Sequence, residues 1–117
     1  TLKSDYQKGL ELNPKLKKAF MSSGLDKFFD FNNDLDKVID ENGKNLSGGQ
    51  LQRISLSRSI FFSSGILILD EICSSLDLKS ELEIIEILKN LSSEYLILYI
   101  THRHNFLDKF DQVIKIN

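Results

Sequence analysis

The second half of the sequence contains two short apolar runs, and polar residues follow directly where each run ends. The first run is Ile66–Glu71, which is apolar up to its two final carboxylates, and the second is Tyr95–Ile100. Runs without alternating polar positions are typical of strands that are buried on both faces of a parallel sheet. We therefore predict one strand at each run.

A helical pattern lies between the two runs. Apolar residues recur there every three or four positions, which predicts a well-buried helix over residues 78–91. The stripe is formed by Leu78, Leu82, Ile85 and Leu88 and is widened by Ile84, Ile87 and Leu91. A helical turn is expected near residues 105–110, and a further strand over residues 112–116. This alternation predicts an α/β fold in which helices cover a parallel sheet.

The first half of the sequence is more polar and is expected to be mainly helical, with polar loops, over residues 1–45. Asn13 and Pro14 are of the types preferred at a helix N-cap and at the first helical position. Apolar residues at helical spacing follow them, at Leu16, Ala19 and Phe20. A second helix is expected over residues 50–62.

The composition excludes few classes of protein. A hydrophobic content of 41% and a charged content of 27% are ordinary for a globular domain. The net charge of -2 gives no electrostatic reason to expect nucleic acid or an anionic membrane as partner. The single Cys73 excludes an internal disulfide and is interpreted as a packing residue. No apolar run approaches the roughly 20 residues needed to cross a bilayer.

The segment Leu46–Gln50, with the sequence LSGGQ, is a candidate phosphate site. Ser47 and Gln50 have the spacing of a capping box, in which two side chains satisfy backbone N–H groups at a helix start. Gly48 and Gly49 allow another molecule to approach the backbone closely. Such a helix start favours anions. An ordinary capped helix with a flexible entry fits these residues equally well.

Polar residues near the ends of the two predicted strands are candidates for catalysis. Of the adjacent carboxylates Asp70 and Glu71, one would hold Mg²⁺ and the other would orient or deprotonate a water molecule. Asp77 lies just before the predicted helix, and His102 follows the second strand, where an imidazole can contact a phosphate oxygen. Taken singly, each is also compatible with a structural role.

Taken in order, these segments resemble the ATP-binding cassette (ABC) ATPase family. Leu46–Gln50 is similar to the family's signature sequence, and Ile66–Glu71 is similar to its Walker B strand. Ser74–Asp77 resembles the D-loop, and His102 resembles the switch histidine. The resemblance implies a partial P-loop NTPase-type sheet. It assigns residues 1–45 to the helical subdomain and residues 46–117 to the signature helix and the C-terminal part of the ATPase core.

The Walker A loop of that family has no counterpart in this sequence. No G-x-x-x-x-G-K-[ST] run occurs anywhere in the 117 residues. Because phosphoryl transfer depends mainly on positioning and charge stabilisation, this lack should be severe. We therefore expect the chain to be the C-terminal half of a nucleotide-binding domain cut from a longer protein, and to be inactive as an ATPase by itself.

The resemblance also implies how the residues would work. ATP and Mg²⁺ would lie between two nucleotide-binding domains arranged head to tail, with the signature of one domain facing the nucleotide of the other. Glu71 would be the general base and Asp70 would support Mg²⁺, while His102 would contact the γ-phosphate. The remaining contacts to the nucleotide or across the dimer would come from Ser47, Gly48, Gly49, Gln50 and Asp77.

The segment before the signature resembles that of exporter-type cassettes. This implies an ABC transporter that couples ATP-driven dimerisation to export, with a transmembrane domain in the same or another chain. The ATPase would lie at the cytoplasmic face of a membrane, and the chain itself would be soluble. Two alternatives stay open at this point. One is a soluble ABC ATPase that acts on nucleic acid or ribosomes, and the other is a non-catalytic interaction module that keeps the signature.

Overall fold

Residues 14–31 and 46–117 are the part of the chain that the computed structural model describes. The chain divides into two units, Thr1–Ser63 and Ser64–Asn117, and each has its own set of helices or strands. The two units are described separately below.

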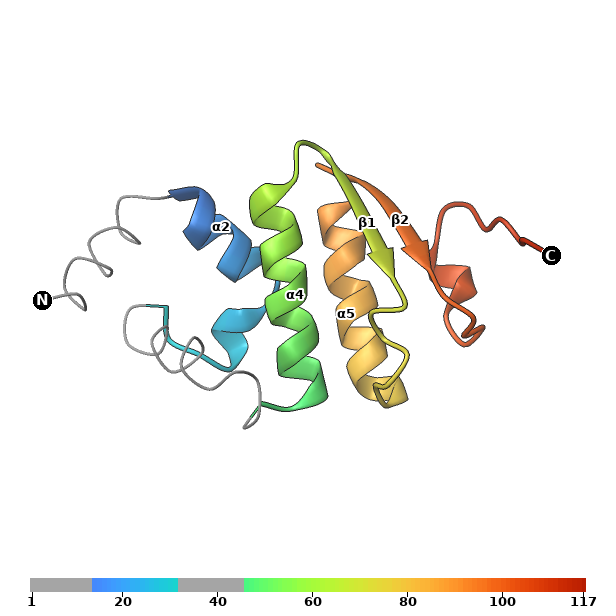
Figure 1. Ribbon diagram of the computed structural model, residues 1–117, viewed down its shortest axis with the longest axis horizontal. Helices are drawn as coiled ribbons and strands as arrows, with labels where there is room; N and C mark the ends of the chain where they lie inside the picture. The colour runs from blue at the N-terminus through green and yellow to red at the C-terminus, as the bar shows by residue number, and fades with distance from the viewer. Residues whose placement is uncertain (1–13, 32–45) are drawn as a thin grey trace, which may run out of the picture. The chain divides into compact units, whose positions relative to one another are not determined.

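The first unit is helical over its described residues. Helix α2 (Pro14–Ser22) packs against helix α4 (Gly48–Phe62), and a short 3-10 helix, η1 (Leu25–Lys27), lies between them in sequence (Figure 1). Ala19 and Phe20, which the helical spacing singled out, are both buried. The predicted helical character of residues 1–45 is thus confirmed for the described part, whereas the expected cap Asn13 lies outside it.

A glycine and an arginine fix the path of the chain after α2. Gly24 has a φ of 75°, a left-handed conformation that ends the helix at little steric cost. The carbonyl oxygen of Gly24 accepts a hydrogen bond of 3.4 Å from Nη1 of Arg53, which lies on α4. The guanidinium of Arg53 also lies 4.9 Å from the ring centroid of Phe28. A buried arginine thus ties the turn after α2 to the helix that begins at the signature.

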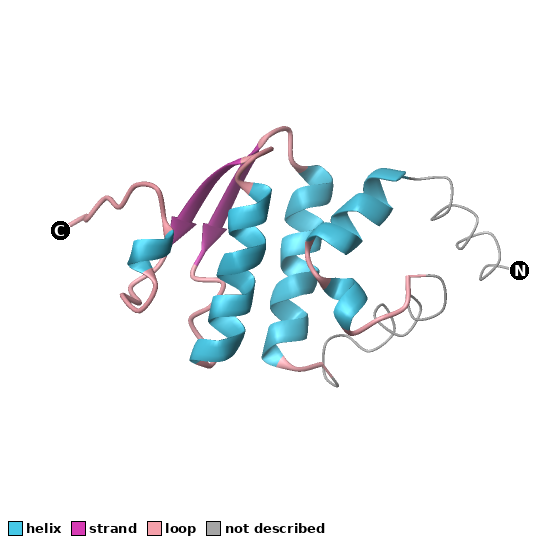
Figure 2. Cartoon of the chain, turned by 180° about the vertical axis from the view of Figure 1, so that it is seen from behind, coloured by secondary structure: helices cyan, strands magenta, loops and turns pink. Residues whose placement is uncertain are grey.

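The second unit is a strand–helix–strand motif. Strand β1 (Ile66–Asp70) pairs in parallel with strand β2 (Leu96–Ile100), and helix α5 (Leu78–Leu91) joins them. The helix runs alongside the strand pair in both views (Figures 1 and 2). A further 3-10 helix, η2 (Leu107–Lys109), follows β2 in the region where a helical turn was predicted. The predicted α/β fold with a parallel sheet is confirmed.

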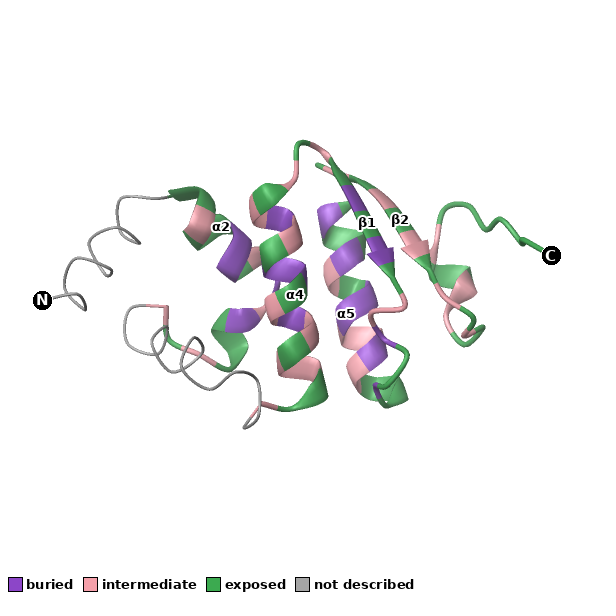
Figure 3. Cartoon of the chain, in the orientation of Figure 1, coloured by how far each residue is buried: buried purple, intermediate pink, exposed green. Residues whose placement is uncertain are grey.

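The two faces of this sheet differ in burial. Leu67 and Leu69 are almost completely buried on one face. The alternate side chains on the other face are exposed, as the colouring along β1 shows (Figure 3). They are Ile66, Ile68, Leu96, Leu98 and Ile100, with exposed fractions from 49% to 64%. The prediction that both faces are buried is therefore wrong for the described chain, because an unbroken apolar run does not reveal which elements cover it.

The buried stripe of α5 is also rotated from the predicted one. Leu78 is exposed, and Glu81 is 2% exposed. The side chains that α5 buries are Glu81, Ile84, Ile85, Leu88 and Leu91. An acidic side chain thus lies on the buried face, where hydrophobicity alone would not place it.

The predicted strand over residues 112–116 is not formed. This segment has no regular secondary structure, and Ile114 and Ile116 are 76% and 90% exposed. A strand needs a neighbour for its backbone N–H and C=O groups. Within the described residues the sheet has two strands, and neither pairs with this segment.

Among the residues described, no helix has both the length and the apolar character needed to cross a membrane. This finding agrees with the sequence, where no apolar run is long enough.

The burial of the two sheet faces leads to a stability prediction. Leu67→Ala should lower the free energy of unfolding of the chain by about 2–5 kcal/mol, because it removes a buried side chain and leaves a cavity. Ile68→Ala, the neighbouring change on the exposed face, should cost clearly less. Urea denaturation followed by circular dichroism measures both. Equal losses for the two variants would contradict the assignment of faces.

Candidate active site

The predicted capping box is present at the start of α4. Ser47 Oγ accepts a hydrogen bond of 3.2 Å from the backbone N–H of Gln50. In return, the side-chain oxygen of Gln50 accepts one of 3.0 Å from the backbone N–H of Ser47. The helix begins at Gly48 and not at Gln50 as expected, so both glycines belong to its first turn.

This helix start has the features of an anion site. The backbone N–H groups of the first helical turn have no intrahelical acceptor, and those of Gly48 and Gly49 belong to this set. Gly48 is exposed, and neither glycine has a side chain to hinder an approaching oxygen. The positive end of the helix dipole adds to the attraction for a negative charge.

At the end of β1 the backbone changes direction sharply. Asp70 is the last residue of the strand and lies opposite Ile100 of β2. Glu71 continues the ladder by one hydrogen bond, from its N–H to the carbonyl oxygen of Ile100 at 2.9 Å. Glu71 has a φ of 56°, a left-handed conformation that costs a residue other than glycine about 1–2 kcal/mol.

The Glu71 carboxylate meets the imidazole that follows β2. Nδ1 of His102 lies 2.7 Å from Oε1 of Glu71. The His102 side chain is 81% exposed, whereas that of Glu71 is 27% exposed. The other oxygen of Glu71, Oε2, is buried and has no hydrogen-bond partner among the described residues. The structure thus brings together two residues that lie far apart in sequence.

Asp77 caps the N-terminus of α5. Its Oδ2 accepts a hydrogen bond of 3.2 Å from the backbone N–H of Ser80. Hydrogen bonds from the side chain and backbone of Ser80 lower the pKa of Asp77 below its usual value. The carboxylate therefore stays ionised, and its negative charge is also favoured by the dipole of the helix.

The side chains of Cys73 and Tyr99 lie close together in the second unit. Cys73 is buried, and burial raises the pKa of its thiol. Burial likewise raises the pKa of the Tyr99 hydroxyl, whose ring stacks on Phe110 with centroids 5.1 Å apart. A neutral, buried thiol is unreactive. The interpretation of Cys73 as a packing residue is confirmed.

Comparison with known proteins places the chain in a family. The model of a family described as "ABC transporter" matches residues 7–74, which is more than half of the chain. The chain belongs to the ABC transporter family. The match includes Ser47–Gln50 and the pair Asp70 and Glu71, and it ends before Asp77 and His102.

Curated proteins similar in sequence to the chain include flippases. The chain is 44% identical over 85 residues to the "ATP-dependent lipid A-core flippase" of Mannheimia succiniciproducens, which covers 73% of this chain and 14% of that protein. It is 42% identical over 98 residues to the flippase of the same name from Escherichia coli strain K12, covering 84% and 17%. The chain thus spans about one sixth of the length of these relatives. No solved structure was found to match it.

The ABC family binds ATP, commonly with Mg²⁺, and the residues present fit part of such a site. The described residues contain no group of three or more His, Cys, Asp or Glu side chains that could hold a metal ion by themselves. Mg²⁺ in nucleotide sites is usually held by one or two carboxylates together with phosphate and water oxygens. Asp70, which is exposed at the end of β1, fits the carboxylate part of that set.

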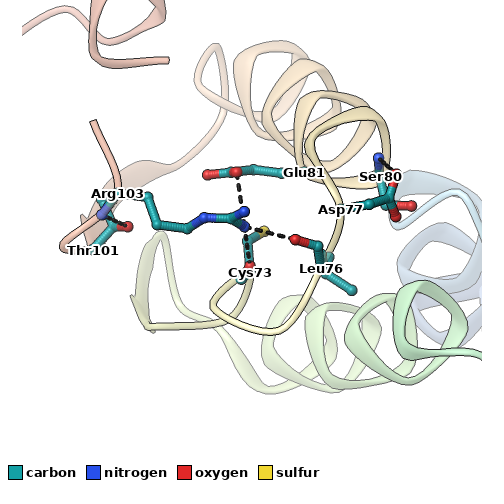
Figure 4. A network of polar contacts seen from close by, with 7 residues as sticks. All are labelled: Cys73, Leu76, Asp77, Ser80, Glu81, Thr101 and Arg103. Atoms are coloured by element: carbon teal, nitrogen blue, oxygen red, sulfur yellow. Dashed lines mark hydrogen bonds and ion pairs between the residues drawn. The ribbon is translucent and has the colours of Figure 1, made fainter. Parts of the chain in front are cut away.

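Two further residues near these side chains have no role that the motifs predict. Arg103 follows His102, and its guanidinium contacts the buried Glu81 at 2.9 Å (Figure 4). A signal for Glu81 was present, since it lies three, four and seven positions before Ile84, Ile85 and Leu88, on the same face of the helix. An acidic residue on an apolar stripe calls for a basic partner, and the sequence does not show which one.

The predicted site residues are divided between the two units. The second unit brings Glu71 into contact with His102 and places Asp70 at the same end of the sheet. Asp77 follows at the start of α5. Ser47–Gln50 belongs to the first unit, at the start of α4.

The lowered pKa of Asp77 predicts how the start of α5 responds to pH. A carboxylate with a depressed pKa stabilises the helix above its unfolded pKa of about 3.9, and the effect is lost as the pH falls through the folded pKa. The protection of the Ser80 amide against hydrogen exchange should therefore be constant down to about pH 4 and fall as the pH is lowered further. Asp77→Asn, an equally good cap that does not titrate, should abolish this dependence. The same pH profile in both proteins would contradict the assignment.

Proposed function

We propose that this chain is part of the ATP-hydrolysing domain of an exporter-type ABC transporter. The observation that carries this proposal is the contact of 2.7 Å between Glu71 and His102 at the C-terminal ends of two parallel strands. In open α/β sheets, ligands bind outside the carboxyl ends of the strands. A carboxylate and an imidazole in contact at that edge suit the activation of water for attack on a phosphate.

Glu71 would act as the general base. Oε1 is held by His102, so the carboxylate has a defined orientation. The side chain is 27% exposed, so part of it can be reached by water. A positioned base of this kind contributes about 10²–10⁴-fold to the rate.

His102 would contact the γ-phosphate. When both ring nitrogens carry a hydrogen, Nδ1 donates to Glu71 and Nε2 can donate to a phosphate oxygen. The high exposure of the ring supports this role, because a ligand can reach it. Asp70 would hold Mg²⁺, and when bound the ion would neutralise negative charge that develops on the phosphates.

The signature would serve the nucleotide of a second domain. Ser47 and the backbone N–H groups of Gly48 and Gly49 would bind the γ-phosphate held by the partner, and Gln50 would keep the helix start in shape. Asp77 would contribute to the contact between the two domains. The capping-box hydrogen bonds support this assignment, since they hold the first turn of α4 in the geometry that suits an anion.

The wider assignment follows from the family and its named relatives. Residues 1–45 would belong to the helical subdomain and residues 46–117 to the signature helix and ATPase core. The complete protein would pair with a second nucleotide-binding domain and a transmembrane domain, at the cytoplasmic face of a membrane. The names of the relatives favour export over a soluble ABC ATPase or a non-catalytic module, and nucleic acid is not expected as a partner.

The role of Glu71 can be tested in the complete transporter that contains this segment. Glu71→Gln keeps the shape of the side chain but not its basicity, so ATP turnover should fall by about 10²-fold or more while ATP binding is retained. Glu86→Gln, the same change on the exposed face of α5, is the matched control and should have no effect. Full turnover in the Glu71→Gln protein would refute the proposal.

The chain by itself is expected to bind ATP weakly and to hydrolyse it negligibly. It lacks the G-x-x-x-x-G-K-[ST] run whose lysine and backbone cradle the phosphates. Phosphate release from the pure 117-residue chain should therefore not exceed the buffer blank. Turnover that is abolished by Glu71→Gln would show that this expectation is wrong.

A further inference from the structure

The side chain of Arg103 joins three segments of the second unit. Its Nη1 atom donates to the carbonyl oxygen of Cys73 at 2.7 Å and to that of Leu76 at 2.9 Å. The same atom lies 2.9 Å from Oε2 of Glu81 on α5. Figure 4 shows the guanidinium pointing between the helix and the loop that precedes it. One side chain next to His102 therefore holds the loop between Glu71 and Asp77.

The contacts converge on a single nitrogen. A terminal guanidinium nitrogen carries two hydrogens, which serve the two carbonyl oxygens. Oε2 of Glu81 has no hydrogen-bond partner among the described residues and is held as an ion pair. Glu81 is 2% exposed and Arg103 is 24% exposed, which means that the pair is largely removed from water. The ion pair compensates the buried charge of Glu81, while the two carbonyl contacts determine the position of the loop. These are two separable effects.

Besides its contacts with Arg103, the loop from Glu71 to Asp77 is held by local turns and by the burial of its apolar side chains. Two turns lie within it, with hydrogen bonds from Ser74 N–H to the Glu71 carbonyl at 3.2 Å and from Leu76 N–H to the Cys73 carbonyl at 3.1 Å. Both hydrogen bonds are local, and the side chains of Cys73 and Leu76 are buried, with 1% and 6% exposure. Arg103 supplies the link from the middle and the end of the loop to the segment after β2.

The backbone around His102 is held at the same point. Thr101 Oγ1 accepts a hydrogen bond of 3.0 Å from the N–H of Arg103, closing a turn with His102 at its centre. The backbone of Arg103 thus orients His102, and its side chain holds the loop that begins at Glu71. Arg103 therefore contacts the loop that follows Glu71 and adjoins His102, the two partners of the 2.7 Å contact.

We propose that Arg103 is a positioning residue, which keeps Glu71 and His102 in contact by locking the Glu71–Asp77 loop to the turn after β2. This inference rests on the proposed function, since its consequence is measured on ATP hydrolysis. If Arg103 served only to compensate the buried charge of Glu81, the carbonyl contacts would have no separate effect on ATP hydrolysis.

The experiment uses the complete transporter and a double variant, Arg103→Met with Glu81→Met. Replacing both members of a buried ion pair by apolar residues is often neutral for stability, whereas removing one leaves a buried charge unpaired. In this variant the Leu76 carbonyl loses the Arg103 donor, and the Cys73 carbonyl keeps only the local hydrogen bond from the Leu76 N–H. We expect kcat to fall about 10–100-fold, with KM for ATP within about twofold of the original, because the reacting groups are misplaced.

Hydrogen exchange provides the readout that a structural role would not change. In the double variant, amides of residues 71–77 should exchange faster, while those of α5 and β1 keep their original rates. An unchanged kcat would overturn the proposal. It would equally be overturned if α5 and β1 lost protection to the same extent as the loop.

A single variant at Glu81 separates the ion pair from the carbonyl contacts, and a single variant at Lys109 is the control. Glu81→Gln removes the ion pair but leaves Arg103 on both carbonyls, so its loss of kcat should be smaller than that of the double variant. An equal loss would assign the effect to the ion pair and contradict the proposal. Lys109→Met breaks the exposed ion pair with Glu86, whose atoms are 3.8 Å apart, and should leave kcat unchanged as a control.

Glu71→Gln is measured alongside these variants. If it retains full turnover, the proposed function fails regardless of Arg103. If it abolishes turnover and the double variant does not lower it, the proposed function stands and the inference about Arg103 is wrong. The two failures can therefore be told apart.

Discussion

The register of one parallel strand pair determines which side chains meet in the second unit. Asp70 lies opposite Ile100, and one further hydrogen bond links Glu71 to the carbonyl of Ile100. This pairing brings Glu71 and His102 to the same end of the sheet. Because side chains alternate along a strand, a slip by one residue would also move Leu67 and Leu69 from the buried to the exposed face. The burial of these two leucines and the contact between the two polar residues thus depend on the same alignment.

Much of this arrangement could be predicted from local patterns. The helix over 78–91 was found with the expected ends, because its apolar spacing and its capping residue agree. Ser47 and Gln50 form the predicted capping box, a motif whose two partners are three residues apart. The two strands follow from apolar runs, and their parallel pairing follows from the helix between them. In each case the deciding contacts are close in sequence or repeat at a fixed period.

The features that could not be predicted depend on contacts distant in sequence. Nothing local indicates that Arg103 reaches Cys73 and Leu76, about thirty residues earlier, or that Glu81 is its counter-charge. The expected strand over 112–116 has suitable residues, but a strand forms only against a neighbour, and no described strand pairs with it. The exposure of one face of the sheet could not be predicted for the same reason. An apolar pattern shows that burial would be favourable, and it does not supply the element that covers the face.

The left-handed conformation of Glu71 shows why these distant contacts matter. A conformation that costs about 1–2 kcal/mol persists only where its surroundings hold it. Glu71 is held by its backbone hydrogen bond to Ile100 and by its side-chain contact with His102. The turn that follows it is held through Cys73 by Arg103. The chemistry proposed for Glu71 requires this conformation, so the residues that maintain it belong to the functional design as much as to the fold.

In both units an arginine side chain donates hydrogen bonds to carbonyl oxygens of turn residues. A carbonyl oxygen has two lone pairs, so in a turn it can accept a hydrogen bond from a distant side chain even where a local N–H also donates to it, as at Gly24 and Cys73. Arg53 supplies one to Gly24 in the first unit, and Arg103 supplies two in the second. Arginine suits this task because it carries several N–H groups at the end of a long side chain and remains charged at all physiological pH values. In the second unit, the carbonyls held in this way belong to the loop that leads from Glu71 to Asp77, so a contact that stabilises the fold also determines the geometry of the candidate active site.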